Sequence, residues 1–127
     1  MTNKPTNLSK VSDFLAVISP KQRLEIILAI GEGEACVCHL EAKLGYRQAY
    51  ISQQLMALRV SGLLDSNRNG KFIFYRLAKP DILELVQNAA KIAGLDRVKL
   101  EPSRHEKQCA CPRCAPAISN STLIENT

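Results

Sequence analysis

Apolar residues recur every three to four positions along five stretches of this chain, which is the spacing of an amphipathic helix. The pattern predicts helices over residues 9–18, 20–30, 38–44 and 47–61. A last helix starts at Lys79-Pro80-Asp81 and is closed by Gly94. Leucine, isoleucine and alanine supply most of the apolar positions, and Trp is absent, as suits a small helical core.

The third and fourth predicted helices are joined by a three-residue turn, Gly45-Tyr46-Arg47. A short helix, a glycine-containing turn and a longer helix form a helix-turn-helix arrangement. The fourth helix places Ile51, Leu55 and Leu58 on its inward face. This pair of helices is therefore the predicted centre of the fold.

Two strand-like runs follow, residues 63–66 and 72–77, with Asn69-Gly70 between them. Asn and Gly tolerate the positive φ angles of a tight turn, so a β-hairpin is predicted. Arg68 and Lys71 lie at its tip. A basic hairpin directly after a helix-turn-helix is a wing. The predicted fold class is mainly α with a small β hairpin, a winged helix-turn-helix.

The chain of 127 residues has the length of one domain with tails. We expect a disordered N-terminal tail over residues 1–8 and a DNA-binding and dimerisation domain over residues 9–95. Residues 96–127 are polar, contain proline and lack periodicity, so they read as a flexible cysteine-containing tail.

Net charge is +5 and the isoelectric point is near 9.1, a balance that permits nucleic acid as a partner. The first nine residues contain no apolar signal core. The longest aliphatic run, residues 26–30, is far too short to cross a bilayer. We therefore expect a cytosolic protein with no membrane partner, in a compartment where thiols stay reduced.

The fourth helix and the hairpin carry the residue types that read DNA. Gln and Ser hydrogen-bond base edges in the major groove, and Arg pairs with guanine or phosphate. Each residue alone could equally be an ordinary solvated side chain, but the helix and the basic wing together favour double-stranded DNA. The predicted contacts are Arg47, Gln48, Tyr50, Ser52, Gln53 and Gln54 on the helix, with Arg68 and Lys71 on the wing.

All five cysteines fall in two clusters, Cys36-Val37-Cys38 and the tail run with Cys109, Cys111 and Cys114. In a cytosolic protein such clusters indicate metal or redox chemistry and not a disulfide framework. Soft thiolates favour thiophilic ions such as Cd, Pb, Zn, As(III) or Sb(III), and four sulphurs in a tetrahedron suit Zn or Cd. The tail can reach the first cluster, because about fifteen residues after Gly94 span up to roughly 50 Å.

Other readings of the thiols remain open. The first pair could be small buried hydrophobes, and the tail cluster with His105 could form its own zinc knot. The same thiols could form disulfides in a redox- or persulfide-sensing repressor. Cys111 and Cys114 match a thioredoxin-like spacing, but Pro112 and the other prolines argue against the βαβ setting it needs. An enzyme is therefore not expected.

Residues 49–55, Leu58-Arg59, Gly62-Leu63 and the wing from Arg68 to Tyr75 resemble the ArsR/SmtB family of metal-sensing repressors. The resemblance covers about residues 10–95. It implies a homodimer whose first and last helices form the interface. It also implies an apo dimer that represses an operator and is released by a metal or metalloid ion.

Cys36-Val37-Cys38 also resembles the family's Cys-Val-Cys signature. In the arsenic sensors a third thiol follows three residues after the second, where this chain has Glu41. Cadmium/lead sensors complete the site with N-terminal cysteines, which this N-terminus lacks. The family's other site, on the last helix, needs Asp/His pairs, and residues 80–94 contain no His. The resemblance thus implies As(III)/Sb(III) or Cd/Pb/Zn as effector. Cys36 and Cys38 with one or two of Cys109, Cys111 and Cys114 could supply the sulphurs for either kind of ion.

Overall fold

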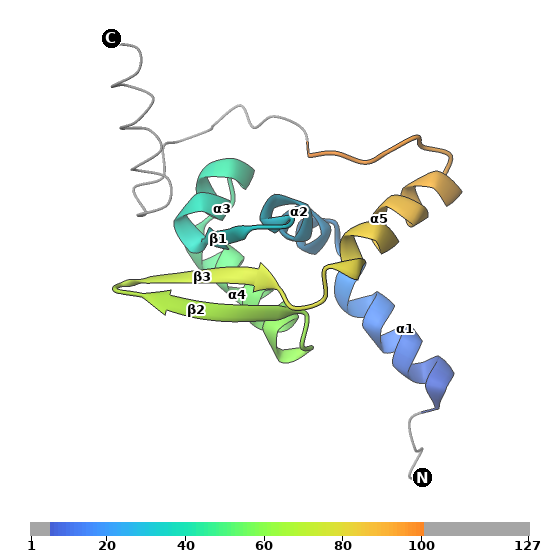
Figure 1. Ribbon diagram of the computed structural model, residues 1–127, viewed down its shortest axis with the longest axis horizontal. Coiled ribbons are helices and arrows are strands. Elements are labelled where there is room, and N and C mark those ends of the chain that lie inside the picture. Colours follow the sequence, from blue (N-terminus) through green and yellow to red (C-terminus); the bar gives the residue numbers. More distant parts are fainter. Residues whose placement is uncertain (1–5, 101–127) are drawn as a thin grey trace.

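The computed structural model describes residues 6–100. It confirms the predicted fold class, with five helices and a hairpin in the described part of the chain. In chain order the elements are α1 (Asn7–Ile18), α2 (Lys21–Ile30), β1 (Glu34–Cys36), α3 (Val37–Leu44), α4 (Gln48–Val60), β2 (Leu64–Asn69), β3 (Phe72–Leu77) and α5 (Asp81–Ile92). Figure 1 shows α1 and α5 at one end of the molecule and the tip of the β2–β3 hairpin at the other.

The core lies where α2, α3 and α4 meet. The predicted inward face of α4 is confirmed, since Ile51, Leu55 and Leu58 are almost fully buried. Leu40 of α3 belongs to the same apolar cluster. On α2, Ile26, Ile27 and Ile30 are buried, whereas Leu24 and Leu28 are half-buried.

A third strand, β1, joins the predicted hairpin in an antiparallel sheet of order β1-β3-β2. Its residues pair with β3 so that Cys36 lies opposite Phe74. No pattern in the sequence predicts this strand, because three residues are too few to show the alternation of a strand. The strand carries the first thiol to the edge of the wing.

The turn of the hairpin is shifted by one residue from the prediction. Asn69 pairs with Phe72, so the two-residue loop is Gly70-Lys71. Gly70 has a φ of +63°, whereas Lys71 has a negative φ. This is the combination of a type II′ turn, in which glycine takes the first loop position. Lys71 therefore lies at the very tip of the wing.

The outer helices bury little of the apolar stripe that the sequence predicts for them. On α1 only Ile18 is buried, while Leu8, Val11 and Leu15 are 79%, 53% and 46% exposed. On α5 the stripe splits, because Ile82 and Val86 face the core and Ile92 is 89% exposed. The domain thus presents apolar side chains from both helices to solvent.

The ends of the domain differ from the expected bounds by a few residues. Helix α1 begins at Asn7, two residues early, because the Thr6 hydroxyl caps it by accepting a hydrogen bond from the Ser9 amide at 3.0 Å. Residues 96–100 were expected to belong to the flexible tail, but Val98 is held to α5 by the Gln87 side chain. A bond between a side chain and the backbone leaves no periodic signal in the sequence.

Candidate nucleic-acid interface and thiol site

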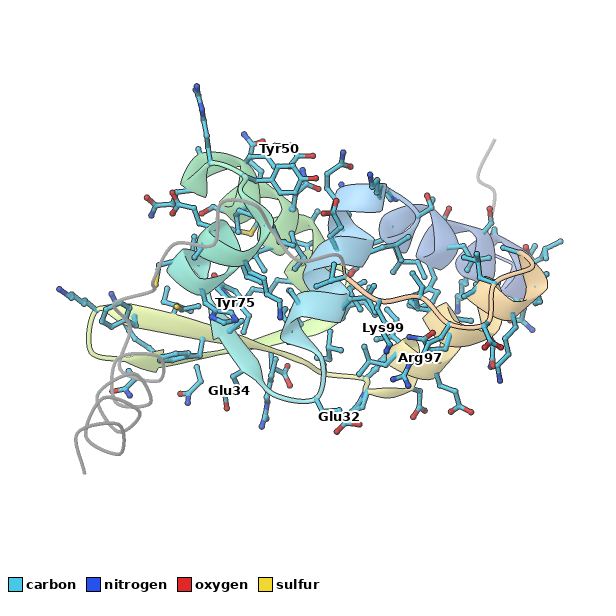
Figure 2. The ribbon with its side chains drawn as sticks, turned by 90° about the horizontal axis from the view of Figure 1, so that it is seen from above. Glu32, Glu34, Tyr50, Tyr75, Arg97 and Lys99 are labelled. Carbon is cyan, nitrogen blue, oxygen red and sulfur yellow. The ribbon has the colours of Figure 1, made fainter. Side chains whose placement is uncertain are left out.

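The predicted reading surface lies along the first two turns of α4. Gln48, Ser52 and Gln53 are exposed, and Arg47 is exposed at the N-cap position. Tyr50 is half-buried and lies on the side of the molecule formed by α3 and α4 (Figure 2). Helix α4 contains no acidic residue, so a polyanion would meet hydrogen-bond donors and no like charge along it.

Gln54 occupies a different position from its neighbours on α4. Its amide oxygen accepts a hydrogen bond from Nε of Arg23 at 2.9 Å, and Nη1 of Arg23 donates to the Val17 carbonyl at 2.9 Å. The same guanidinium thus joins α4 to α2 and to the last turn of α1. Gln54 therefore holds α4 against α2 through this hydrogen bond, and its amide oxygen is not free to contact DNA.

A second polar link fixes the turn that leads into α4. The Tyr46 hydroxyl donates a 2.7 Å hydrogen bond to Oε1 of Glu25 on α2, and the Tyr46 ring lies 5.3 Å from the Tyr50 ring. Burial, and then the Glu25 carboxylate, raise the pKa of Tyr46 to about 12. Sequence reasoning missed this pair, because Glu25 reads as an ordinary polar position on an amphipathic helix.

We predict that Tyr46→Phe lowers the free energy of unfolding by about 1 kcal/mol, because it leaves Glu25 without this donor. In the wild type this contribution is complete below the ordinary tyrosine pKa of 10.0 and is lost as the pH rises through about 12. Urea unfolding followed by circular dichroism measures it. In a Glu25→Ala background, which offers no acceptor to the Tyr46 hydroxyl, the same substitution should cost clearly less, and an equal cost would contradict the link.

The wing carries the remaining predicted DNA contacts. Arg68 and Lys71 are both exposed, and the Lys71 ammonium lies 5.5 Å from the centre of the Phe72 ring. Asp65 and Arg76 form an exposed 3.8 Å ion pair nearer the base of the hairpin, and a pair this exposed contributes little to stability. The tip, with no acidic residue between positions 66 and 72, is left positive.

Cys36 and Cys38 are brought together at the start of α3. Their sulphur atoms lie 3.0 Å apart, which is contact without the bond of about 2.05 Å that a disulfide has. Cys36 is 2% exposed and is the N-cap residue, accepting a 3.4 Å hydrogen bond from the His39 amide. Cys38 is half-buried.

The thiol pair contacts both halves of the predicted DNA-binding surface. Cys36 and Cys38 pack in one cluster with Phe74 and Phe72 of the wing strand β3. The helix that they begin packs against α4, through the core cluster that holds Leu40. The predicted helix-turn-helix implied the packing of α3 against α4. Sequence reasoning missed the connection to the wing, because β1 was not predicted.

The sulphur pair alone is an incomplete metal site. Between residues 6 and 100, no three His, Cys, Asp or Glu side chains are grouped so that they could hold a metal ion. Tetrahedral zinc with Zn–S bonds of about 2.3 Å places two sulphurs roughly 3.8 Å apart, so the pair must open by less than about 1 Å. The donors fit a soft ion, but further ligands are needed. Cys109, Cys111 and Cys114 lie outside the described residues.

Comparison with known proteins places these features among bacterial regulators. The family model for "Bacterial regulatory protein, arsR family" matches residues 20–66, from α2 to the start of the wing. Within residues 6–100, no helix has the length and apolar character needed to cross a membrane.

Two curated relatives and one solved structure illustrate the similarity. The biofilm growth-associated repressor of Agrobacterium fabrum is 39% identical over 79 residues, 62% of this chain and 68% of that protein. The arsenical resistance operon repressor of Escherichia coli K12 is 43% identical over 63 residues, 49% of this chain and 54% of that protein. The crystal structure of the transcriptional repressor BigR from Xylella fastidiosa matches with a TM-score of 0.62 at 38% identity, covering 67% of this chain and 87% of that one.

Proposed function

We propose that a thiophilic ion releases this protein from its operator by binding to Cys36 and Cys38. The premise is that the chain belongs to the ArsR/SmtB family of DNA-binding transcriptional repressors and is not an enzyme. The observation that carries the proposal is the 3.0 Å contact of the two sulphurs at the junction of α3 with the wing. A ligand that bridges them acts on the support of the recognition helix and on β3 at once.

The donor set points to a soft ion. Two sulphurs favour As(III) or Sb(III), or Cd, Pb or Zn, over hard cations. The similarity to an arsenical resistance repressor is in keeping with a metalloid. Two donors fall short of the three or four that such ions take, and Cys109, Cys111 and Cys114 are the remaining thiols of the chain. We propose that one or two of them complete the site.

For the DNA-bound state we propose that α4 enters the major groove. Arg47, Gln48 and Tyr50, with Ser52 and Gln53, lie within its first two turns and are open to a partner. Arg68 and Lys71 of the wing would meet phosphates or the minor groove. Gln54 supports this surface through Arg23. A repressor works where its operator is, so we propose a cytosolic location, in which the thiols stay reduced.

We expect the wing contacts to contribute to DNA affinity for every sequence and the α4 contacts to contribute to specificity for the operator. Arg68→Ala or Lys71→Ala should weaken binding to all DNA sequences and reduce the salt dependence by about one unit of slope per lost phosphate contact. Gln53→Ala should cost roughly 1–3 kcal/mol on the operator and relax specificity. Fluorescence anisotropy with operator and scrambled duplexes at several salt concentrations measures both. Unchanged operator affinity in all three variants would remove the winged-helix mode of binding.

The test of the effector is a titration of the protein–operator complex with As(III) or Cd²⁺ under strict reduction. We expect release from DNA, and we expect truncation after Arg104 to weaken ion binding at least about tenfold while repression is kept. A truncated protein that responds to the ion as well as the full chain would exclude the tail from the site.

Redox sensing is the second candidate, because sulphurs 3.0 Å apart are also close enough to be oxidised together. In that case a peroxide releases the operator without any ion, dithiothreitol restores binding, and the ion has no effect under reduction. The same anisotropy assay distinguishes the two functions.

A further inference from the structure

We propose that Arg23 sets the base preference of Gln54, by holding the amide oxygen of Gln54 so that only its N–H donors can contact DNA. The inference rests on the proposed function, since it assumes that α4 enters the major groove. Arg23 lies on α2, outside the predicted reading surface. It acts as a positioning residue for specificity, because it restricts the bases that Gln54 can recognise.

The orientation of the Gln54 amide follows from the chemistry of its partner. A guanidinium carries five N–H donors and no acceptor, so the atom of Gln54 that faces Nε of Arg23 at 2.9 Å must be the oxygen. A flipped amide would turn an N–H group toward another N–H group and lose the hydrogen bond. The contact therefore fixes the side chain in one orientation, with its nitrogen on the branch of the amide that points away from Nε.

Arg23 is itself held in place. Its side chain is half-buried, and its Nη1 donates to the Val17 carbonyl of α1 at 2.9 Å. The donors of a guanidinium form a rigid planar fork, so two hydrogen bonds fix its direction as well as its position. Within residues 6–100, no carboxylate forms an ion pair with Arg23. No stronger, charged acceptor therefore draws the guanidinium away from Gln54 in this part of the chain.

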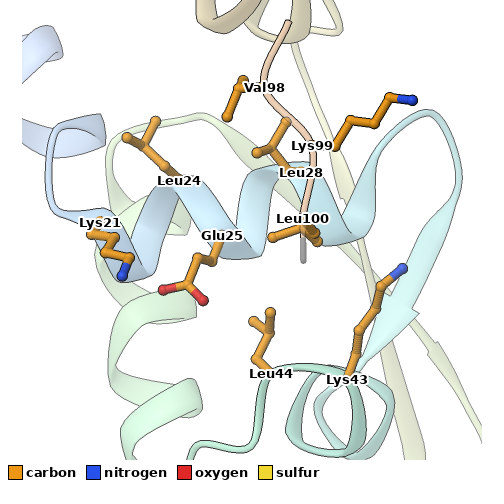
Figure 3. Close-up of a pocket in the computed structure, with 9 residues that line it drawn as sticks. All are labelled: Lys21, Leu24, Glu25, Leu28, Lys43, Leu44, Val98, Lys99 and Leu100. Carbon is orange, nitrogen blue, oxygen red and sulfur yellow. The ribbon is translucent and has the colours of Figure 1, made fainter. Parts of the chain in front are cut away.

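Helix α4 is also held against rotation about its own axis, because a second bond ties the turn before it to α2. The Tyr46 hydroxyl donates to Glu25 at 2.7 Å. Figure 3 shows Glu25 on the side of α2 that faces Leu44 at the end of α3, across a groove of about 420 Å³. The bonds of Glu25 and Arg23 thus attach α2 to the turn and to the second turn of α4. The direction in which Gln54 leaves α4 is therefore fixed as well.

Gln54 lies at the edge of the predicted reading surface. Arg47, Tyr50 and Gln54 form one row along the helix, because side chains three and four positions apart lie on the same face. Gln54 is half-buried, whereas Gln53 is exposed. A half-buried side chain keeps part of its surface open to a partner. The side-chain nitrogen is the atom of the amide that remains for DNA, since Arg23 engages the oxygen.

A side chain that offers only donors reads a different base from a free glutamine. A free glutamine recognises adenine through a bidentate pair, in which its oxygen accepts from N6 and its nitrogen donates to N7. With the oxygen held by Arg23, this pair cannot form, and the N6 amino group of adenine would meet a second donor. Guanine presents two acceptors in the major groove, N7 and O6, and thymine presents O4. Gln54 is therefore assigned to a guanine or a thymine and not to an adenine.

Selection of binding sites from a pool of randomised DNA duplexes tests this assignment, with the wild type, Arg23→Met and Gln54→Ala. We expect the wild type to prefer guanine or thymine at one position of each half-site, and Gln54→Ala to reduce that preference at least about threefold. Arg23→Met removes every donor to the Gln54 oxygen, so it should relax the same position and admit adenine there. In a Gln54→Ala background, Arg23→Met should change the base preference no further, since Arg23 acts through Gln54.

Arg97→Met is the matched control, since it removes the same charge from an exposed side chain beyond α5, and it should leave every base preference unchanged. Should Arg23→Met not fold by circular dichroism, Gln54→Ala still decides, because the base whose preference is lost shows which atoms of Gln54 made the contact. An adenine at the relaxed position, or an unchanged preference in folded Arg23→Met or in Gln54→Ala, would overturn the inference. If Gln53→Ala also leaves all preferences unchanged, the proposed entry of α4 into the major groove fails instead, so the two failures are distinguishable.

Discussion

Replacing Cys36 and Cys38 by serine is expected to leave operator binding intact and to abolish release by As(III) or Cd²⁺. The substitution removes both sulphurs that the described structure offers to a soft ion. An ion that favours the DNA-free form by only about 3 kcal/mol lowers operator affinity more than a hundredfold. Loss of the thiols should therefore remove an effect of about that size.

The fold should tolerate these substitutions. Cys36 is the N-cap of α3, where its sulphur accepts the hydrogen bond of the His39 amide. Serine is among the preferred residues at this position, so the cap is kept. Cys38 is half-buried, where a hydroxyl of similar shape costs little. A change in DNA response can then be assigned to the ligand site and not to unfolding.

The measurement is the operator affinity by anisotropy, with and without saturating ion, for each single variant and the double variant. Val37→Thr is the matched control. Val37 lies between the two thiols, and threonine has nearly the same shape as valine, so the substitution removes no sulphur. Ion binding by the wild type should also weaken at low pH, because protons compete for the thiolates. Release of the double variant at the wild-type ion concentration would place the effector site elsewhere.

Much of this fold could be predicted from local pattern. The period of Ile51, Leu55 and Leu58 on α4 matches the face that is buried, because one helix must turn its apolar stripe to the core. The glycine at position 70 predicted a hairpin, since only glycine takes a positive φ without strain. The exact loop register depended on pairing between strands, and the prediction missed it by one residue.

The rest depended on contacts between residues far apart in the chain. The bonds Arg23–Gln54, Tyr46–Glu25 and Gln87–Val98 span 31, 21 and 11 residues. Neither partner of such a bond is unusual in its own segment, so no local rule singles it out. Strand β1 is the same case, because Cys36 joins the sheet only through pairing with Phe74. The pairing of Cys36 with Phe74 connects the thiols to the wing, and the Gln87–Val98 bonds connect residue 98 to α5.

Replacing Leu15 by glutamate is expected to give monomers of a protein that we propose to be a homodimer, and to lower operator affinity by roughly a hundredfold or more. Leu15 lines an apolar groove of about 360 Å³ between α1 and α5, together with Leu85. Leu8 and Ile92, on the same two helices, are 79% and 89% exposed. Apolar side chains exposed in such numbers indicate an interface, and a charge placed among them would be buried without a partner.

Dimerisation matters for DNA because a two-fold operator needs two recognition helices about 34 Å apart. A monomer binds only one half-site. It therefore loses the increase in affinity that comes from binding two linked half-sites, which is commonly a factor of 10² to 10⁴.

Sedimentation equilibrium at micromolar concentration measures the loss of the dimer, and anisotropy on the full operator measures the loss of DNA affinity. Val60→Glu is the control, since Val60 is 79% exposed on α4 and away from the groove, and it should stay dimeric. Because Leu15 is 46% exposed, the monomer should remain folded by circular dichroism. A Leu15→Glu protein that is still dimeric would exclude the outer helices as the interface, and a monomeric wild type with full operator affinity would exclude the dimer itself.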